Sequence, residues 1–182
     1  MLVMIKLSKS KTVTRTFSLR KELVDALEKE ALSRNISTSS LMNQTLEKSI
    51  QLNWPSEKTK ALVIARDIIK RYVDALPLDV LHQIGSLSAQ EHKHTALILM
   101  GTHQTLDSVL DLLSINYGKN ARWFNLTHAI KGKENRVLLN HDMGLKWSVF
   151  LEAYVRSFLI EMLDIPIRSN YSDNTVVFEF KL

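Results

Sequence analysis

The stretch TRTFSLRKELVDALEKEALSRNISTSSLMNQTLEKSI, residues 14–50, decides the fold of the N-terminal part of this chain. The segment Thr12–Leu19, which overlaps the start of this stretch, is rich in Thr, Val and Phe, and this composition favours a β-strand. Phe17 and Leu19 fall on one face of that strand, and Thr14, Thr16 and Ser18 fall on the other. The backbone groups of a single short strand need a partner, and the chain becomes helical at once. The partner strand is therefore expected from elsewhere.

Two helices are predicted to follow this strand. Residues Arg20–Arg34 place apolar side chains at helical spacing, and Asn35 is a residue that tolerates the left-handed conformation at a helix end. Ser37 is then expected to cap a second helix that runs from Thr38 to about Leu52. One strand and two helices of this size cannot bury their apolar faces alone. We therefore predict a homodimer in which the strand pairs antiparallel with its two-fold mate.

This order of parts resembles the ribbon–helix–helix family, the β-ribbon DNA readers of the Arc and MetJ type. The resemblance covers residues 14–50 and rests on the alternating strand, the helix beginning just after Leu19, and the NIS turn before a Ser-capped helix that contains Leu41 and Met42. It implies that a homodimer inserts a two-stranded antiparallel ribbon into the major groove of double-stranded DNA.

The resemblance also implies roles for individual residues. The base-reading positions are Thr14, Thr16 and Ser18, whose hydroxyls can donate or accept hydrogen bonds and can touch a thymine methyl group. The start of the second helix is expected to hold a phosphate through its exposed amides and the helix dipole. Arg15 falls on the nominally inward face, where an apolar residue is usual, so we expect it to reach outward. The phosphate-binding residues expected are Lys9, Lys11, Arg15, Arg20, Lys21, Ser37, Thr38 and Ser39.

The distribution of charge agrees with a polyanion partner. Residues 1–53 hold nine basic and five acidic residues, whereas residues 54–182 hold fifteen and fourteen. The first twenty residues contain five basic groups and no acid. Basic charge concentrated at one end of an otherwise balanced chain is the footprint of a nucleic-acid binder. A solvated basic tail is the alternative interpretation of the same pattern.

A helical connector is predicted between the DNA-binding module, residues 1–53, and the rest of the chain. Trp54-Pro55 closes the first module, since the residue before proline disfavours helix. A helix with a broad apolar face is expected over Glu57–Leu76, followed by Pro77 and a short helix, Leu78–Ile84, that ends at Gly85. This connector, residues 54–87, is expected to act as a spacer or as a second dimer contact.

Residues 88–182 are predicted to form an accessory domain, so that the whole chain has the α+β class. Ser88 and Glu91 are read as a capping box for a long helix, Ala89–Ile115. That helix is apolar on several sides, and we therefore expect one of its faces to contact a second subunit. The remaining elements complete an α-ββ-α-ββ order: a hairpin of Arg122–Ile130 and Asn135–Asn140, a helix over Leu145–Leu163, and two extended stretches, Pro166–Ser169 and Thr175–Lys181.

The most distinctive stretch of this half is NHDMGLKWSVFLEAY, Asn140–Tyr154. It resembles the C-terminal portions of archaeal ribbon–helix–helix proteins that carry an HD-x-G-x-x-WS stretch before a long helix. The resemblance implies a regulator whose accessory domain dimerises or senses a ligand or partner. His128, His141 and Trp147 are the candidate lining of a ligand pocket. In the alternative interpretation, Trp147 belongs to the core and Gly144 permits a turn.

Several classes of function are not expected. The histidines do not fall at metal-binding helical spacing with carboxylate support, so we expect no metal and no cofactor. No glycine-rich phosphate loop or nucleophile elbow occurs, so we expect no enzyme. The chain lacks cysteine, and neither a signal peptide nor about 18 consecutive apolar residues for a membrane span is found. A cytoplasmic, nucleoid-associated protein with no membrane partner is expected.

The leading prediction is a sequence-specific transcriptional regulator, with repression the expected mode. A non-specific architectural DNA-binding protein is a second hypothesis, supported by a reading face made only of small hydroxyls. An antitoxin or partition protein, with a protein-binding C-terminal half, is a third. The sequence predicts a well-packed second half, whereas the C-terminal arm of an antitoxin is usually short and disordered. Operator sequence and effector are left open.

Overall fold

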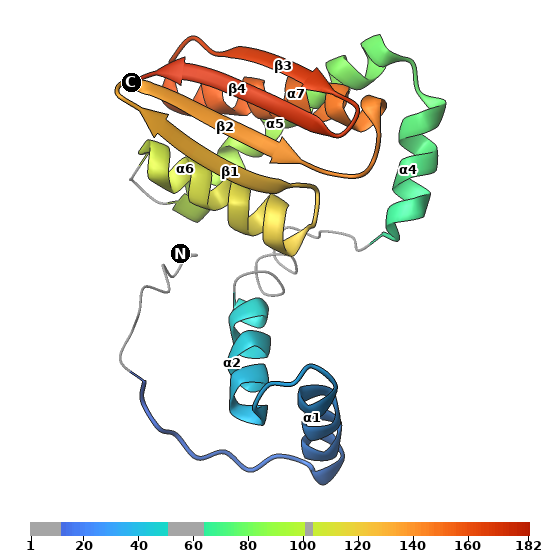
Figure 1. Cartoon of the computed structure of the whole chain (residues 1–182), viewed down its shortest axis with the longest axis vertical. Helices are drawn as coiled ribbons and strands as arrows, with labels where there is room; N and C mark the ends of the chain where they lie inside the picture. The colour runs from blue at the N-terminus through green and yellow to red at the C-terminus, as the bar shows by residue number, and fades with distance from the viewer. Residues whose placement is uncertain (1–11, 51–63, 101–103) are drawn as a thin grey trace. The chain divides into compact units, whose positions relative to one another are not determined.

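The structure is a computed structural model that describes residues 12–50, 64–100 and 104–182 (Figure 1). The chain forms two compact units, one of Met4–Ala61 and one that includes Leu62–Leu182. The first holds the predicted DNA-binding module. The second holds both the predicted connector and the predicted accessory domain. Among the helices that the structure describes, none has the length and hydropathy required to cross a bilayer.

The first unit contains the two predicted helices, α1 (Lys21–Ser33) and α2 (Thr38–Lys48). The turn between them contains Asn35 with φ of 52°, in the left-handed conformation expected of a residue that ends a helix. Ala31 on α1 and Leu41 on α2 are the buried apolar residues of the helix pair. The two predicted helices and the turn between them are confirmed, although the predicted end of the second helix near Leu52 lies outside the described residues.

The strand predicted over Thr12–Leu19 is not formed within a single chain. Residues 12–20 are exposed and have neither helix nor strand structure, so the ribbon of the predicted ribbon–helix–helix module is not confirmed. All strands among the described residues belong to the second unit. The physical reason is that this segment has no partner strand in its own chain to pair with its backbone groups. The same lack of a partner led us to expect a dimer.

The second unit is a four-stranded antiparallel sheet with helices, which confirms the α+β class. Its strand order is β1-β2-β4-β3, built from two hairpins that pair through β2 and β4. Both predicted hairpins are present, and β3 begins two residues later than predicted. The elements in chain order are α4 (Arg66–Ala75), α5 (Leu78–Met100), α6 (Leu106–Leu112), the π-helix η2 (Leu113–Asn120), β1 (Asn125–Lys131), β2 (Glu134–Asn140), α7 (Leu145–Leu163), β3 (Arg168–Ser172) and β4 (Thr175–Lys181).

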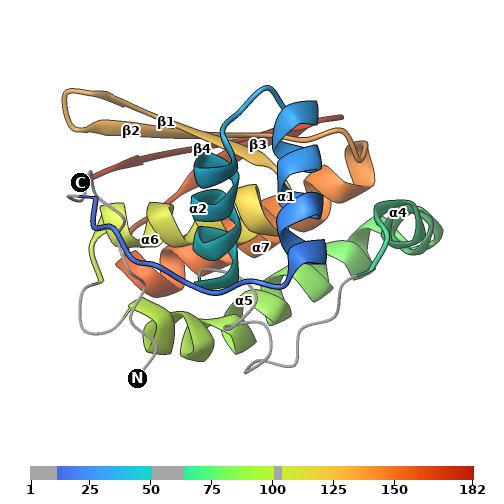
Figure 2. The same cartoon turned by 90° about the horizontal axis from the view of Figure 1, so that it is seen from below.

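Helix α7 is the centre of the second unit. Figure 2 shows α5, α6 and α7 on the same side of the sheet. Eleven of the nineteen residues of α7 are buried, among them Leu151, Tyr154 and Phe158, which is the pattern of a helix covered on all sides. The strands contribute alternate apolar residues to this core, including Val137 and Leu139 of β2. The predicted helix over Leu145–Leu163 is confirmed at both ends.

Two helix boundaries predicted around Gly85 are wrong. Gly85 does not end a short helix, because α5 runs through it, and residues 87 and 88, the predicted junction of connector and accessory domain, lie inside α5. Gly85 is instead buried where α5 lies close against α7. A Cβ atom at this position would lie 2.7 Å from the Phe150 carbonyl oxygen and 3.0 Å from the Ala153 Cβ atom. A glycine is needed here because the two helices pack closely, and not because a helix ends at this residue.

The long helix predicted over Ala89–Ile115 is also wrong. Helix α5 ends at Met100, and α6 begins after Thr105, which with Ser108 makes a capping box of the kind predicted for Ser88 and Glu91. The apolar residues beyond this break are buried within the same unit: Val109, Leu110, Leu112 and Leu113. For these four residues, burial within their own unit replaces the contact with a second subunit that we expected.

Candidate nucleic-acid interface and polar groups of the second unit

The extended segment of residues 12–20 presents its apolar and hydroxyl side chains together to solvent. Phe17 is 74% exposed and Leu19 is 47% exposed. The base-reading candidates Thr14, Thr16 and Ser18 alternate with these residues and are exposed as well. An exposed Phe and Leu at alternate positions of an extended segment leave a large apolar surface uncovered in a single chain.

The start of α2 has the geometry of an anion-binding helix terminus. The Ser37 side chain accepts a hydrogen bond of 3.1 Å from the Ser40 amide, which confirms Ser37 as the N-cap. No acidic residue lies in the first turn of α2. Thr38 and Ser39 occupy the first two helical positions. The backbone amides at these positions have no acceptor within the helix. Amides and helix dipole at this point favour a negatively charged group.

The basic candidates divide into two groups. Arg15 and Arg20 are exposed on the extended segment, and Lys21 is the exposed first residue of α1. Lys9 and Lys11 lie outside the described residues. Arg15, Arg20 and Lys21 belong to the same eight-residue stretch, residues 14–21, as the hydroxyl side chains. The first unit therefore carries positive charge and hydrogen-bonding groups along one short segment.

The three candidate pocket residues of the second unit do not meet. The His128 Nε2 atom lies 2.9 Å from the Asn135 Oδ1 atom, in the β1–β2 hairpin. His141 follows the C-terminal end of β2, and three residues separate it from Val137, the cross-strand partner of His128. Trp147 is buried in the core, and its indole NH donates to the Trp123 carbonyl at 3.2 Å. The core interpretation of Trp147 therefore agrees with the structure.

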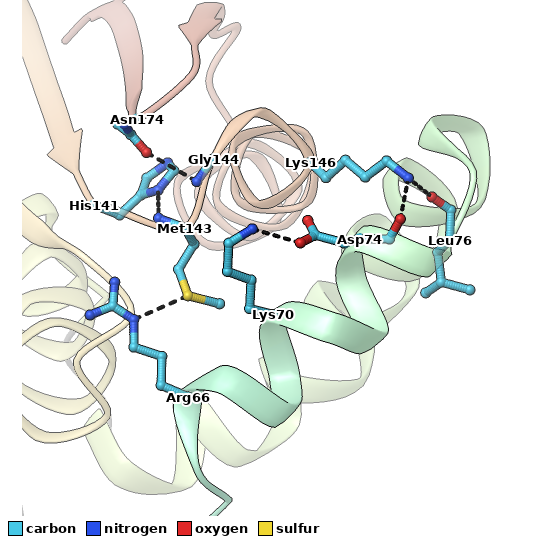
Figure 3. A network of polar contacts seen from close by, with 9 residues as sticks. All are labelled: Arg66, Lys70, Asp74, Leu76, His141, Met143, Gly144, Lys146 and Asn174. Carbon is cyan, nitrogen blue, oxygen red and sulfur yellow. Dashed lines mark hydrogen bonds and ion pairs between the residues drawn. The ribbon is translucent and has the colours of Figure 1, made fainter.

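His141 belongs to a specific hydrogen-bond network that joins three segments. The Met143 amide donates to His141 Nδ1 at 3.2 Å, so the ring proton of neutral His141 is on Nε2 (Figure 3). Nε2 lies 2.8 Å from Ser148 Oγ, and the Ser148 hydroxyl donates to the Asp173 carbonyl at 3.2 Å. Burial, helped by the charge of Arg66, lowers the pKa of His141 to about 4.

This proton arrangement is the reverse of a nucleophilic Ser–His pair. In such a pair the imidazole accepts the hydroxyl proton, whereas here the His141 Nε2 group donates to the buried Ser148. The network ties the end of β2, the first turn of α7 and the β3–β4 turn together. Gly144 contributes to the same junction, since its amide donates to Asn174 Oδ1 at 3.0 Å. Its φ of 86° explains the glycine in the turn before α7.

Helix α4 is attached to this junction by charged side chains. The Lys146 ammonium donates to the Asp74 carbonyl at 2.6 Å and to the Leu76 carbonyl at 2.7 Å, which places a cation at the C-terminal end of α4. At the other end of α4, Arg66 pairs with Asp142 and donates to Met143 Sδ at 3.1 Å. Figure 3 shows the contacts of Lys146 with Asp74 and Leu76 at one end of the helix and of Arg66 with Met143 at the other. Lys70 forms an ion pair of 2.6 Å with Asp74 along α4 itself.

Two groups of buried polar residues were not predicted from the sequence. The first is a cluster in which His92 Nδ1 lies 2.9 Å from the Tyr154 hydroxyl, and the Tyr117 ring packs edge-on against the Tyr154 ring with 5.6 Å between their centroids. Burial lowers the pKa of His92 and raises the pKa of both tyrosines. The rings of Trp123 and Phe150 pack against Tyr154. Because the rings fill the space around these polar groups, this cluster is a specific part of the core.

The second such group surrounds Glu152, a buried carboxylate on α7. Ser169 of β3 donates to Glu152 Oε1 at 2.6 Å, and Arg156 and His82 each approach its oxygens at 3.9 Å. A carboxylate inside the apolar run of a central helix was the available signal, since such a group needs partners when buried. These contacts connect α5, α7 and β3.

Within the described ranges, no group of three or more His, Cys, Asp or Glu residues has the arrangement to hold a metal ion. No protein-family model matches the chain, and no curated protein is significantly similar to it in sequence.

Proposed function

We propose that the chain is a sequence-specific DNA-binding regulator of transcription, acting as a repressor. In this proposal two copies pair their residues 12–19 as an antiparallel ribbon of the ribbon–helix–helix type, which enters the major groove. The observation that carries the proposal is that exposed apolar side chains alternate with hydroxyl side chains in this segment. Phe17 and Leu19 are exposed in one chain, and hydroxyl side chains occupy the intervening positions.

Ribbon formation accounts for both sets of residues. Pairing of two segments satisfies their backbone groups and places Phe17 and Leu19 of both copies against the helices α1 and α2. That arrangement covers apolar residues that are also exposed on the helices, such as Leu23 and Leu46. The opposite face of the ribbon then presents Thr14, Thr16 and Ser18 to base edges.

The remaining polar groups of the first unit serve the DNA backbone in this proposal. Arg15, Arg20 and Lys21 contact phosphates beside the ribbon, and Lys9 and Lys11 extend this contact along the chain. The amides of Thr38 and Ser39 at the start of α2 hold a further phosphate. These contacts orient the dimer on the duplex without reading sequence.

The second unit is proposed to act as an accessory domain without a catalytic step. In its His–Ser pair, His141 donates a hydrogen bond to Ser148 and does not accept the hydroxyl proton, which supports this assignment. No ligand pocket formed by His128, His141 and Trp147 together is proposed, because these residues lie apart.

The test begins with selection of bound fragments from random duplex DNA by the full-length protein. We expect a palindromic site, bound about 10³-fold or more tightly than random DNA. Replacing Thr14, Thr16 and Ser18 together by alanine should remove this preference and leave salt-dependent general binding. The matched control is Thr127→Ala, an exposed threonine of β1 that is expected to change neither.

A second variant separates positioning from reading. Replacing Arg20 and Lys21 by alanine should weaken binding to all sequences alike. It should also reduce the salt slope by about 0.9 for each phosphate that is no longer neutralised. An alanine triple variant that still protects the same site would contradict the ribbon as the reader. Equal binding to all sequences by the unchanged protein would contradict regulation and would support architectural binding.

A further inference from the structure

Helix α4 has two apolar faces, and only one of them is covered in its own unit. Val73 is buried and Ile69 is half-buried, on the face that packs towards α7. About 100° around the helix, Ile68 is 47% exposed and Tyr72 is 67% exposed. The exposed alanines Ala65 and Ala75 lie on the same side. We call Ala65, Ile68, Tyr72 and Ala75 the α4 stripe.

The orientation of the stripe is fixed by the contacts at both ends of α4. Figure 3 shows Lys146 bound to the carbonyls at the C-terminal end and Arg66 bound to Met143 at the N-terminal end, where Arg66 also pairs with Asp142. The helix could turn Ile68 and Tyr72 towards α7 only if these contacts were broken. The stripe therefore faces away from the core of its own unit, and its small alanines would allow another helix to approach closely.

The charges beside the stripe suit a second copy of the same helix. Asp67 and Arg71 are both exposed and, one turn apart, lie along the same edge of the stripe. When two identical helices pack antiparallel about a two-fold axis, the same edge of each faces the other. Arg71 of each helix then lies within reach of Asp67 of its mate. The result is two reciprocal pairs of opposite charge beside an apolar seam.

We propose that α4 pairs antiparallel with α4 of a second copy of the chain, with the two-fold axis between Ile68 and Tyr72. This proposal rests on the proposed function, because two ten-residue helices bury far less than the about 800 Å² per partner of a stable interface. The ribbon dimer supplies the missing association by holding the two chains together. Thirteen residues separate Ile50 from Ile64 and can span at most about 45 Å. The linked helices thus meet at a high effective concentration.

The absence of cysteine from the chain provides a clean cross-linking test. In the full-length protein, Ile68→Cys treated with a short bismaleimide should give a covalent dimer in high yield. Gln90→Cys, an exposed position on α5 outside the stripe, is the matched control and should give at least fivefold less. Thr16→Cys reports independently on the proposed ribbon.

The outcomes are separable. Cross-linking of Ile68→Cys and Thr16→Cys, with little from Gln90→Cys, supports the α4 pairing. Cross-linking of Thr16→Cys alone overturns the α4 pairing and leaves the ribbon dimer standing. Failure of both cysteines overturns the ribbon dimer and the α4 pairing together. Equal yields at residues 68 and 90 indicate random collision and also overturn the pairing.

A charge exchange tests the reciprocal pairs. In the Ile68→Cys background, Asp67→Arg or Arg71→Asp alone should reduce the yield by about threefold to fivefold, since exposed pairs contribute up to about 1 kcal/mol each. The double exchange, Asp67→Arg with Arg71→Asp, should restore the yield, because opposite charges face each other again. A double exchange no better than the single variants would overturn the antiparallel register.

Discussion

The two units of this chain differ in how they use their apolar residues. Among the described residues, the first unit buries two apolar side chains, Ala31 and Leu41, whereas the second unit buries 25. The first unit leaves Val13, Phe17 and Leu32 largely exposed. The second has a central helix enclosed by a sheet and other helices. The second unit therefore has a core of its own, and the first has the surface of half a core.

This difference has a consequence for function. A unit that completes its core only with a second copy makes folding, dimerisation and the formation of a reading surface one event. A unit with its own core can hold groups in fixed places, as it does around His141 and Glu152. The exposed α4 stripe is an apolar surface that the core of the second unit leaves uncovered, and it is where we propose that dimerisation continues.

The largest expected effect separates two phenylalanines. Phe158 is fully buried on α7, so Phe158→Ala should lower the free energy of unfolding of the second unit by about 3–5 kcal/mol. Phe17→Ala should leave that transition unchanged, because Phe17 is exposed within the chain, and should weaken the dimer instead. Thermal and urea unfolding, followed with sedimentation, would measure both. If both variants lowered the free energy of unfolding of the second unit equally, the contrast between the two units would be contradicted.

A smaller effect is expected where α5 packs against α7. Alanine is about 1 kcal/mol better than glycine inside a helix, so propensity alone predicts that Gly85→Ala stabilises the protein. We expect a loss of about 1–3 kcal/mol, because the added Cβ atom would meet the Phe150 carbonyl oxygen at 2.7 Å. The control is Ser86→Ala, on the next, half-buried position of the same helix. A gain in stability at Gly85 would contradict the close packing.

The smallest expected effect is a dependence on pH at His141. Its pKa is lowered from 6.5 to about 4 in the folded chain. Between these values the unfolded chain binds a proton that the folded chain does not, so the free energy of unfolding falls as pH is lowered from about 6.5 to 4. The contribution is fully present above the unfolded pKa.

The variant His141→Gln checks this sign. At neutral pH it should be less stable than the unchanged protein, by about 1 kcal/mol, because the hydrogen bonds of the imidazole are removed. The difference should narrow as pH approaches 4, because only the unchanged protein loses the His141 contribution. Urea titrations at several pH values would measure it. A difference that stays constant with pH would show that His141 is not held neutral.

Sequence patterns predicted the local elements better than the contacts between them. The amphipathic run at Leu145–Leu163 and the two hairpins were predictable, because periodicity and turn residues are local signals. Gly85 was misread, because a glycine that ends a helix and one that admits a neighbouring helix look alike without that neighbour. The break before Thr105 was missed because apolar residues continue on both sides of it.

The site residues show the same limit. His128, His141 and Trp147 were grouped by residue type, and the structure distributes them between a hairpin, a loop junction and the core. The partners of Glu152 come from α5 and β3, which are far apart in sequence. In the first unit, the cap at Ser37 was predictable because its geometry involves only adjacent residues.

The central claim is that residues 12–50 complete their core with a second copy, whereas the core of the second unit is formed within one chain. Hydrogen exchange of the full-length chain, measured over a range of protein concentrations, tests this claim most directly. We predict that amides of residues 12–19 and of α1 and α2 become protected as concentration rises, while α7 and the sheet are protected throughout. Residues 12–19 that exchange freely at every concentration, or protection of the first unit that does not depend on concentration, would contradict the account.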